Sequence, residues 1–72
     1  MPSFPDRLKE LRKAKGVTQK AMAKFLDVTE QHYQRYEYGK HEPNLDAINK
    51  LADFFDVSLD YLTGRSDNPN RQ

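Results

Sequence analysis

The sequence predicts an all-α fold of five short helices in one compact domain. Apolar residues recur at intervals of three and four in several segments, which is the period of an amphipathic helix. Residues that favour helix N-caps precede these segments, and Gly16, Gly39 and Gly64 stand where helices are expected to end. Alternation with a period of two never persists, so no strand is expected. A chain of 72 residues suits a single small domain.

The first helix is expected to follow Ser3, which is a good N-cap residue. Phe4, Leu8 and Leu11 lie one turn apart along it, so they form its apolar side. Gly16 is expected to end this helix because glycine adopts the left-handed conformation of a C-terminal cap.

Two further helices are expected within residues 18–39, capped by Thr18 and Thr29 and joined by a tight turn over residues 27–29. On the first of them, one stripe is predicted to be buried: Ala21, Met22, Phe25 and Leu26.

The helix over residues 30–38 separates polar from aromatic residues when they are stepped at about 100° each. Tyr33 and Tyr36 point one way and are read as core, although the tyrosines also suit a stacking platform for single-stranded nucleic acid. The opposite, polar face consists of Glu30, Gln31, Gln34, Arg35 and Tyr38. Such a face is either simply solvated or presented to a ligand.

Asn44 and Ser58 are expected to cap the last two helices. The fourth carries the most regular amphipathic pattern of the chain: Leu45, Ile48, Leu51, Ala52 and Phe55. The fifth carries Leu59 and Leu62. Residues 65–72 contain no large apolar residue, so a flexible C-terminal tail is predicted after a domain over residues 4–64.

Composition excludes several classes of protein. The chain has no cysteine, which rules out a disulfide framework or a cysteine-based zinc site. Its apolar runs are too short for a membrane span or a signal peptide, so a cytoplasmic protein is expected. His32 and His41 do not have the helical spacing of a ligand pair, and no metal is expected. Without a catalytic constellation or a phosphate-binding loop, we expect no enzyme activity, cofactor or small-molecule ligand.

The charge is unevenly distributed. Residues 1–41 carry nine Lys or Arg and five Asp or Glu, a balance of +4, whereas residues 42–72 carry three and six, a balance of −3. A basic half suggests a surface that faces phosphates. The alternative is that 32% charged residues merely keep a small domain soluble.

Several short motifs, in this order and spacing, resemble the phage repressor and Cro-type helix-turn-helix family. They are Gly16-Val17-Thr18-Gln19, Tyr36-Glu37-x-Gly39, Pro43, Val57-Ser58-Leu59 and Leu62-Thr63-Gly64. The resemblance extends from Phe4 to Gly64 and implies a lambda-repressor-like DNA-binding domain. In such a domain the second helix crosses the DNA backbone and the third enters the major groove.

The resemblance also implies roles for individual residues. The positions expected to read bases are Glu30, Gln31, Gln34 and Arg35, whose side chains suit base edges. The positions expected to contact phosphates are Gln19, Thr29, Tyr38, Lys40 and His41. Arg12 and Glu37 are expected to pair with each other and brace the reading helix.

Two residues depart from the family pattern. Asp27 stands where a glycine is usual, at a position that requires a left-handed backbone, which Asp tolerates better than most residues. Tyr33 stands where Ile or Val is usual, and its ring either packs beside the small Ala21 and Ala23 or tips toward the DNA.

The predicted function is that of a DNA-binding transcription regulator, a repressor that binds a double-stranded operator as a homodimer. Two reading helices about 34 Å apart would supply the specificity that one small domain lacks. The dimer contact is placed at Phe54, Leu59 and Tyr61. The alternative is a protein-interaction or antitoxin-like module of the same fold, for which DNA contact is secondary.

Overall fold

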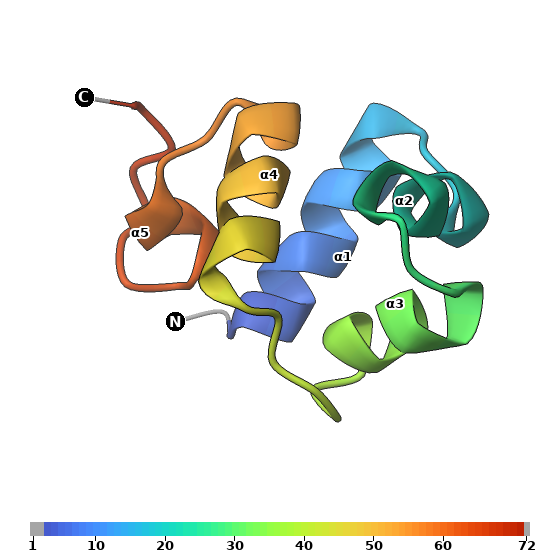
Figure 1. Ribbon diagram of the computed structural model, residues 1–72. Coiled ribbons are helices and arrows are strands. Elements are labelled where there is room, and N and C mark those ends of the chain that lie inside the picture. The colour runs from blue at the N-terminus through green and yellow to red at the C-terminus, as the bar shows by residue number, and fades with distance from the viewer. Residues whose placement is uncertain (1–2, 72) are drawn as a thin grey trace.

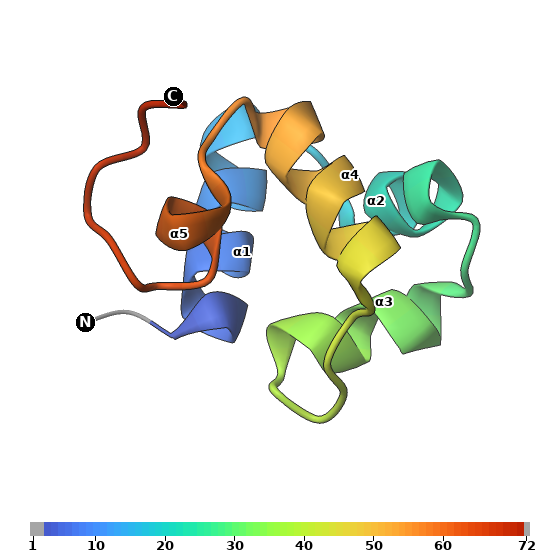
Figure 2. The same ribbon diagram turned by 60° about the vertical axis from the view of Figure 1, so that its left-hand side comes forward.

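The computed structural model describes residues 3–71, and within them the predicted all-α class is confirmed. Its five helices are α1 (Phe4–Lys15), α2 (Gln19–Leu26), α3 (Glu30–Glu37), α4 (Leu45–Phe55) and α5 (Leu59–Leu62). Figure 1 shows α1 in the middle of the molecule, with α4 and α5 on one side and α2 on the other. Helix α3 packs against both α1 and α2, as the turned view in Figure 2 also shows.

Four of the five predicted N-caps make the hydrogen bond that defines a cap. The side chains of Thr18, Thr29, Asn44 and Ser58 each accept from the backbone N–H three residues later, over 2.8–3.0 Å. Ser3 occupies the cap position, but its hydroxyl instead donates to the Asp6 carboxylate over 3.1 Å. The four capping hydrogen bonds fix where α2, α3, α4 and α5 begin.

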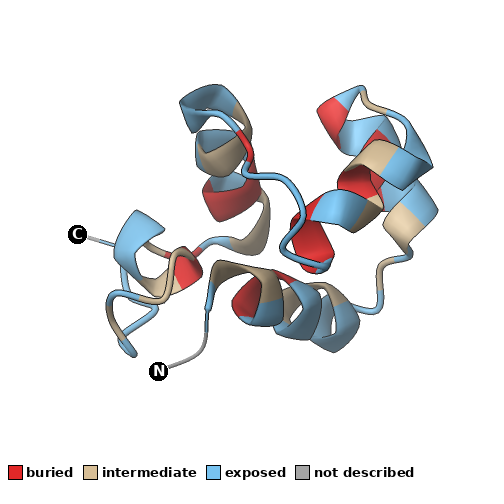
Figure 3. Ribbon diagram, turned by 90° about the horizontal axis from the view of Figure 1, so that it is seen from below, coloured by how far each residue is buried: buried red, intermediate tan, exposed pale blue. Residues whose placement is uncertain are grey.

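The core lies where the five helices meet. Figure 3 shows buried positions on the sides of the helices that face one another and exposed positions outside. Its buried apolar residues are Leu8, Met22, Ala23, Leu26, Tyr33, Tyr36, Leu51, Ala52, Val57 and Leu62. Every helix contributes at least one of them, so the small domain has a single core.

Some residues that the periodicity assigned to the core are exposed. Helix α2 buries Met22, Ala23 and Leu26, so Ala21 faces solvent and Phe25 remains 44% exposed. The sequence prediction placed the buried stripe about one residue away from its actual centre. Leu45, the first residue of α4, is 71% exposed.

Residues 65–71 lie against the helices. Figure 2 shows this segment curving around α5 toward the end of α4. The Pro69 carbonyl accepts from Ser58 N over 3.0 Å, and Arg71 Nη2 donates to Asp53 Oδ1 over 2.6 Å. Arg7, which is 3% exposed, reaches Asp67 over 3.2 Å. These contacts were not predicted, and the division into a domain over 4–64 and a flexible tail stays a prediction.

Candidate nucleic-acid interface

The turn between α2 and α3 has the backbone that the sequence requires. Asp27 adopts φ 59° and ψ 46°, the left-handed conformation expected where the family pattern has glycine. The next amide, Val28 N–H, donates to the Ala23 carbonyl over 3.0 Å, and Thr29 then caps α3. The turn therefore changes the chain direction within three residues and holds α3 against α2.

Tyr33 points into the core. Its side chain is fully buried, and its ring contacts the Tyr36 ring edge-on at a centroid distance of 6.2 Å. Its hydroxyl donates to Glu37 Oε2 over 2.6 Å. Burial, together with the nearby Glu37 carboxylate, raises the pKa of Tyr33, so the hydroxyl remains a donor. Of the two orientations that the sequence left open, the inward one is observed.

Arg12 and Glu37 form an ion pair between α1 and α3. Arg12 Nε lies 2.5 Å from Glu37 Oε2, and Arg12 Nη2 lies 3.2 Å from Glu37 Oε1. The remaining nitrogen, Nη1, donates to the Val17 carbonyl over 2.9 Å. Because the Glu37 side chain is fully buried, this pair is shielded from solvent on one side.

The Glu37 carboxylate is ionised despite its burial. Burial by itself raises the pKa of Glu37, but hydrogen bonds from Arg12, Tyr33 and Gln19 outweigh it, and the pKa is lowered from its ordinary value. The end of α3 is thus fixed by groups from α1, α2 and its own preceding turn. The buried side of α3 is therefore tied to the rest of the domain by hydrogen bonds.

The opposite side of α3 faces solvent. We call Glu30, Gln31, Gln34, Arg35 and Tyr38 the outer face of α3. All of them except Gln34 are exposed, and the exposed fraction of Tyr38 is 58%. Gln34 is half-buried because its Nε2 donates to Gln19 Oε1 over 3.2 Å. The four residues predicted to read bases therefore lie on one side of one helix.

The residues predicted to contact phosphates differ in whether their side chains are exposed or already hydrogen-bonded within the protein. Lys40 and His41 are exposed in the segment after α3, and the His41 ring stacks on Tyr36 with an interplanar angle of 19°. Thr29 uses its hydroxyl oxygen as the cap of α3. The Gln19 amide is occupied by Glu37 and Gln34, so its backbone N–H at the start of α2 is the freer group.

The structure brings His32 and His41 together, which their positions in the sequence did not indicate. Their ring centroids are 5.0 Å apart, and His32 Nε2 lies 2.9 Å from the Tyr36 hydroxyl. Within residues 3–71 there is no cluster of three or more side chains suited to hold a metal ion. Helices long and apolar enough to cross a membrane are likewise absent from this part of the chain.

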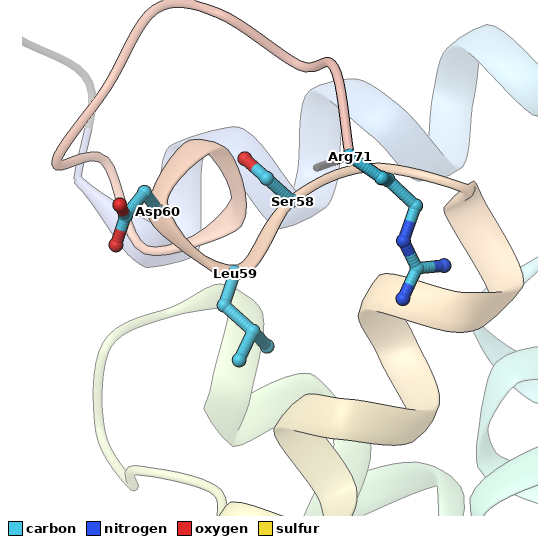
Figure 4. A pocket seen from close by; sticks show the side chains of 4 residues that line it. All are labelled: Ser58, Leu59, Asp60 and Arg71. Carbon is cyan, nitrogen blue, oxygen red and sulfur yellow. The ribbon is translucent and has the colours of Figure 1, made fainter.

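The three residues assigned to a dimer contact have different neighbours. Leu59 is 41% exposed and lines a surface pocket of about 400 Å³ together with Ser58, Asp60 and Arg71 (Figure 4). Phe54 is half-buried, and its ring lies 4.8 Å from that of Phe25.

Tyr61 is covered by the guanidinium of Arg7 at 3.8 Å from its ring centroid. Leu59 is thus the most accessible of the three dimer-contact candidates.

Sequence reasoning missed the contacts of Gln19 with Gln34 and Glu37. These residues lie 15 and 18 positions after Gln19, and so large a separation leaves no periodic signal in the sequence. The bond from Tyr33 to Glu37 had a possible signal, because residues four apart on a helix are neighbours.

Comparisons with known proteins agree with this arrangement. The model of the helix-turn-helix family matches residues 8–62. A prophage-derived transcriptional regulator of Bacillus subtilis strain 168, YonR, is 48% identical over 59 residues, which are 82% of this chain and 55% of that protein. The chain spans about half the length of the curated relatives it matches.

Solved structures that are 34% and 26% identical to this chain share its fold. The restriction-modification controller protein C.AhdI from Aeromonas hydrophila superposes with a TM-score of 0.72 at 34% identity, covering 82% of this chain and 89% of that one. The DNA-binding domain of the P22 C2 repressor superposes with a TM-score of 0.77 at 26% identity, covering 85% and 80%. The chain belongs to the helix-turn-helix family.

Proposed function

We propose that this protein is a sequence-specific DNA-binding transcription regulator, a repressor, which reads the major groove with the outer face of α3. One observation carries the proposal: polar side chains are presented on one side of a helix whose other side is fixed by Tyr33 and Glu37. Arg35 suits guanine O6 and N7, Gln31 and Gln34 suit adenine, and Glu30 suits cytosine N4. A rigid helix bearing such side chains is what direct readout requires.

Phosphate contacts would fix the register of α3 on the duplex. Lys40 and His41 are exposed beside the end of α3, and Tyr38 offers an accessible hydroxyl. Gln19 and Thr29 stand at or just before the starts of α2 and α3, where backbone N–H groups favour anions. Contacts of this kind position the protein but carry no sequence information.

The regulator acts as a homodimer on a pseudo-palindromic operator. Helix α3 has eight residues, which make about 12 Å of helix, so one copy reads only a few base pairs. Two copies would place their reading helices about 34 Å apart, one turn of DNA. We place the contact at Phe54, Leu59 and Tyr61, and centre it on Leu59 because this is an exposed apolar residue at the start of α5. A repressor of this type works in the cytoplasm and needs no cofactor.

Selection of duplexes from a random library, followed by titration over a series of salt concentrations, tests the proposal. The selected duplex is expected to bind at least about 10³-fold more tightly than a scrambled one, and both affinities are expected to fall steeply with salt. Lys40→Ala should reduce the salt slope by about one, whereas the control Lys50→Ala, on α4, should not. Equal affinity for selected and scrambled DNA would contradict the proposal and favour a protein-interaction module.

A further inference from the structure

The side-chain amides of Gln19 and Gln34 form a chain of hydrogen bonds that ends on the Glu37 carboxylate. Gln19 Nε2 donates to Glu37 Oε1 over 3.1 Å, and Gln34 Nε2 donates to Gln19 Oε1 over 3.2 Å. The chain joins the first residue of α2 to two positions on α3. We call these three residues the Gln34 relay.

The negative charge of Glu37 determines which atoms donate and which accept along the relay. An ionised carboxylate only accepts hydrogen bonds, and Glu37 already receives them from Arg12 and Tyr33. Gln19 must therefore turn its amide nitrogen toward Glu37, which leaves its oxygen facing Gln34. Gln34 in turn must direct its nitrogen to Gln19.

Gln34 is left with its carbonyl oxygen and one N–H for a ligand. A glutamine amide that is free can exchange its oxygen and nitrogen by a half-turn about its last torsion. In the relay this turn would set the oxygens of Gln34 and Gln19 against each other and break the hydrogen bond between them. The Gln34 amide therefore keeps one orientation at the edge of the outer face of α3.

We propose that Glu37, acting through Gln19, fixes the amide orientation of Gln34 so that its carbonyl oxygen is kept available to accept from the exocyclic amino group of a base, which this residue therefore prefers. The inference rests on the proposed function, because it concerns how α3 reads DNA. Adenine N6 and cytosine N4 are the amino groups that the major groove exposes. Glu37 and Gln19 are positioning residues, since of the three only Gln34 touches the base.

Gln19→Met tests the relay because it removes both hydrogen bonds of Gln19 while keeping a similar side-chain volume and the Arg12–Glu37 pair. Base preferences are measured at every position of the selected duplex, and the position read by Gln34 is the one whose preference Gln34→Ala abolishes. The wild type should prefer adenine or cytosine there. Gln19→Met should reduce that preference about 3- to 10-fold, the factor that one hydrogen bond supplies.

A lost phosphate contact of Gln19 would have a different effect, since it would weaken binding to all sequences alike. Lys20→Met, at an exposed neighbouring position of α2, is the matched control and should leave every base preference unchanged. Gln19→Met added to Gln34→Ala should likewise change no preference further. Thermal melting of each variant verifies that it is folded.

Three results would overturn the relay while leaving the proposed function in place. They are an unchanged preference in Gln19→Met, a wild-type preference for guanine or thymine at the position of Gln34, and a Gln34→Ala variant that reads every base as the wild type does. A wild-type protein with no sequence preference at all would overturn the proposed function and the relay together.

Discussion

The hydroxyl of Tyr33 donates a 2.6 Å hydrogen bond to the carboxylate of Glu37, one turn further along α3. Both side chains are buried, and the same carboxylate receives Arg12 from α1 and Gln19 from α2. Where the family pattern has an aliphatic residue, this chain therefore uses a ring that fills the core and also supplies a donor. The orientation of α3 depends on this group of buried polar contacts.

Tyr33→Phe keeps the ring but removes the hydroxyl donor. Because a hydrogen bond to a charged group contributes more than a neutral one, the free energy of unfolding is expected to fall by about 1–3 kcal/mol. Urea denaturation measures the change. The control Tyr38→Phe alters a 58% exposed residue of the same helix and should change stability by less than about 0.5 kcal/mol. Equal effects of the two substitutions would show that the Tyr33 bond stabilises nothing.

The lowered pKa of Glu37 makes the free energy of unfolding depend on pH. A carboxyl group whose pKa is lower in the folded than in the unfolded protein stabilises fully above its unfolded value, which is 4.5 here, and loses this effect as pH falls through the folded value. The wild type should therefore exceed Glu37→Gln in stability at neutral pH, and the difference should shrink below about pH 4.5. Denaturation curves from about pH 7 down to about pH 3 test this. A difference that stays constant over that range would contradict the assigned ionisation.

The contact between Arg7 and Asp67 predicts that the segment after α5 contributes to stability. Arg7 is 3% exposed, and Asp67 is the carboxylate that pairs with it. Asp67→Asn is expected to lower the free energy of unfolding by about 1 kcal/mol, and truncation after Gly64 by more. The control Asp46→Asn disturbs an exposed pair with Lys50 and should cost less than about 0.5 kcal/mol. A truncated chain as stable as the full one would show that this segment is dispensable.

The proposed dimer contact is tested by charging Leu59. Leu59→Asp should shift the protein from dimer to monomer in sedimentation measurements and weaken binding to a two-site operator, because a charge would be buried at the contact. Leu45→Asp is a close control, since Leu45 is also the exposed first residue of a helix. It should leave assembly unchanged. If Leu59→Asp still sediments as a dimer, the contact lies elsewhere.

Local features of this fold were predictable because their causes are local. The caps at Thr18, Thr29, Asn44 and Ser58 depend on a side chain and an amide three residues apart, and all four are present. The left-handed backbone at Asp27 followed from the family pattern. The pairing of Arg12 with Glu37 also came from the resemblance, since nothing in their spacing of 25 residues indicates it.

Features that depend on how the helices cross were not predictable. Periodicity placed Phe25 in the buried stripe of α2, whereas the structure buries Ala23 and leaves Phe25 44% exposed. The contacts of Arg71 with Asp53 and of Gln34 with Gln19 join residues distant in sequence, so no local pattern reports them. At the site, the sequence and the family resemblance were enough to select the outer face of α3. The Gln34 relay behind it became visible only in the structure.

The most direct measurement of the central claim is the binding energy of wild type and Arg35→Ala for every single base-pair substitution of the selected operator. If the outer face of α3 reads bases, Arg35→Ala should lose about 1–3 kcal/mol of discrimination at one base pair in each half-site and keep the others. A loss of affinity that is the same for all sequences, or no loss at all, would contradict that claim.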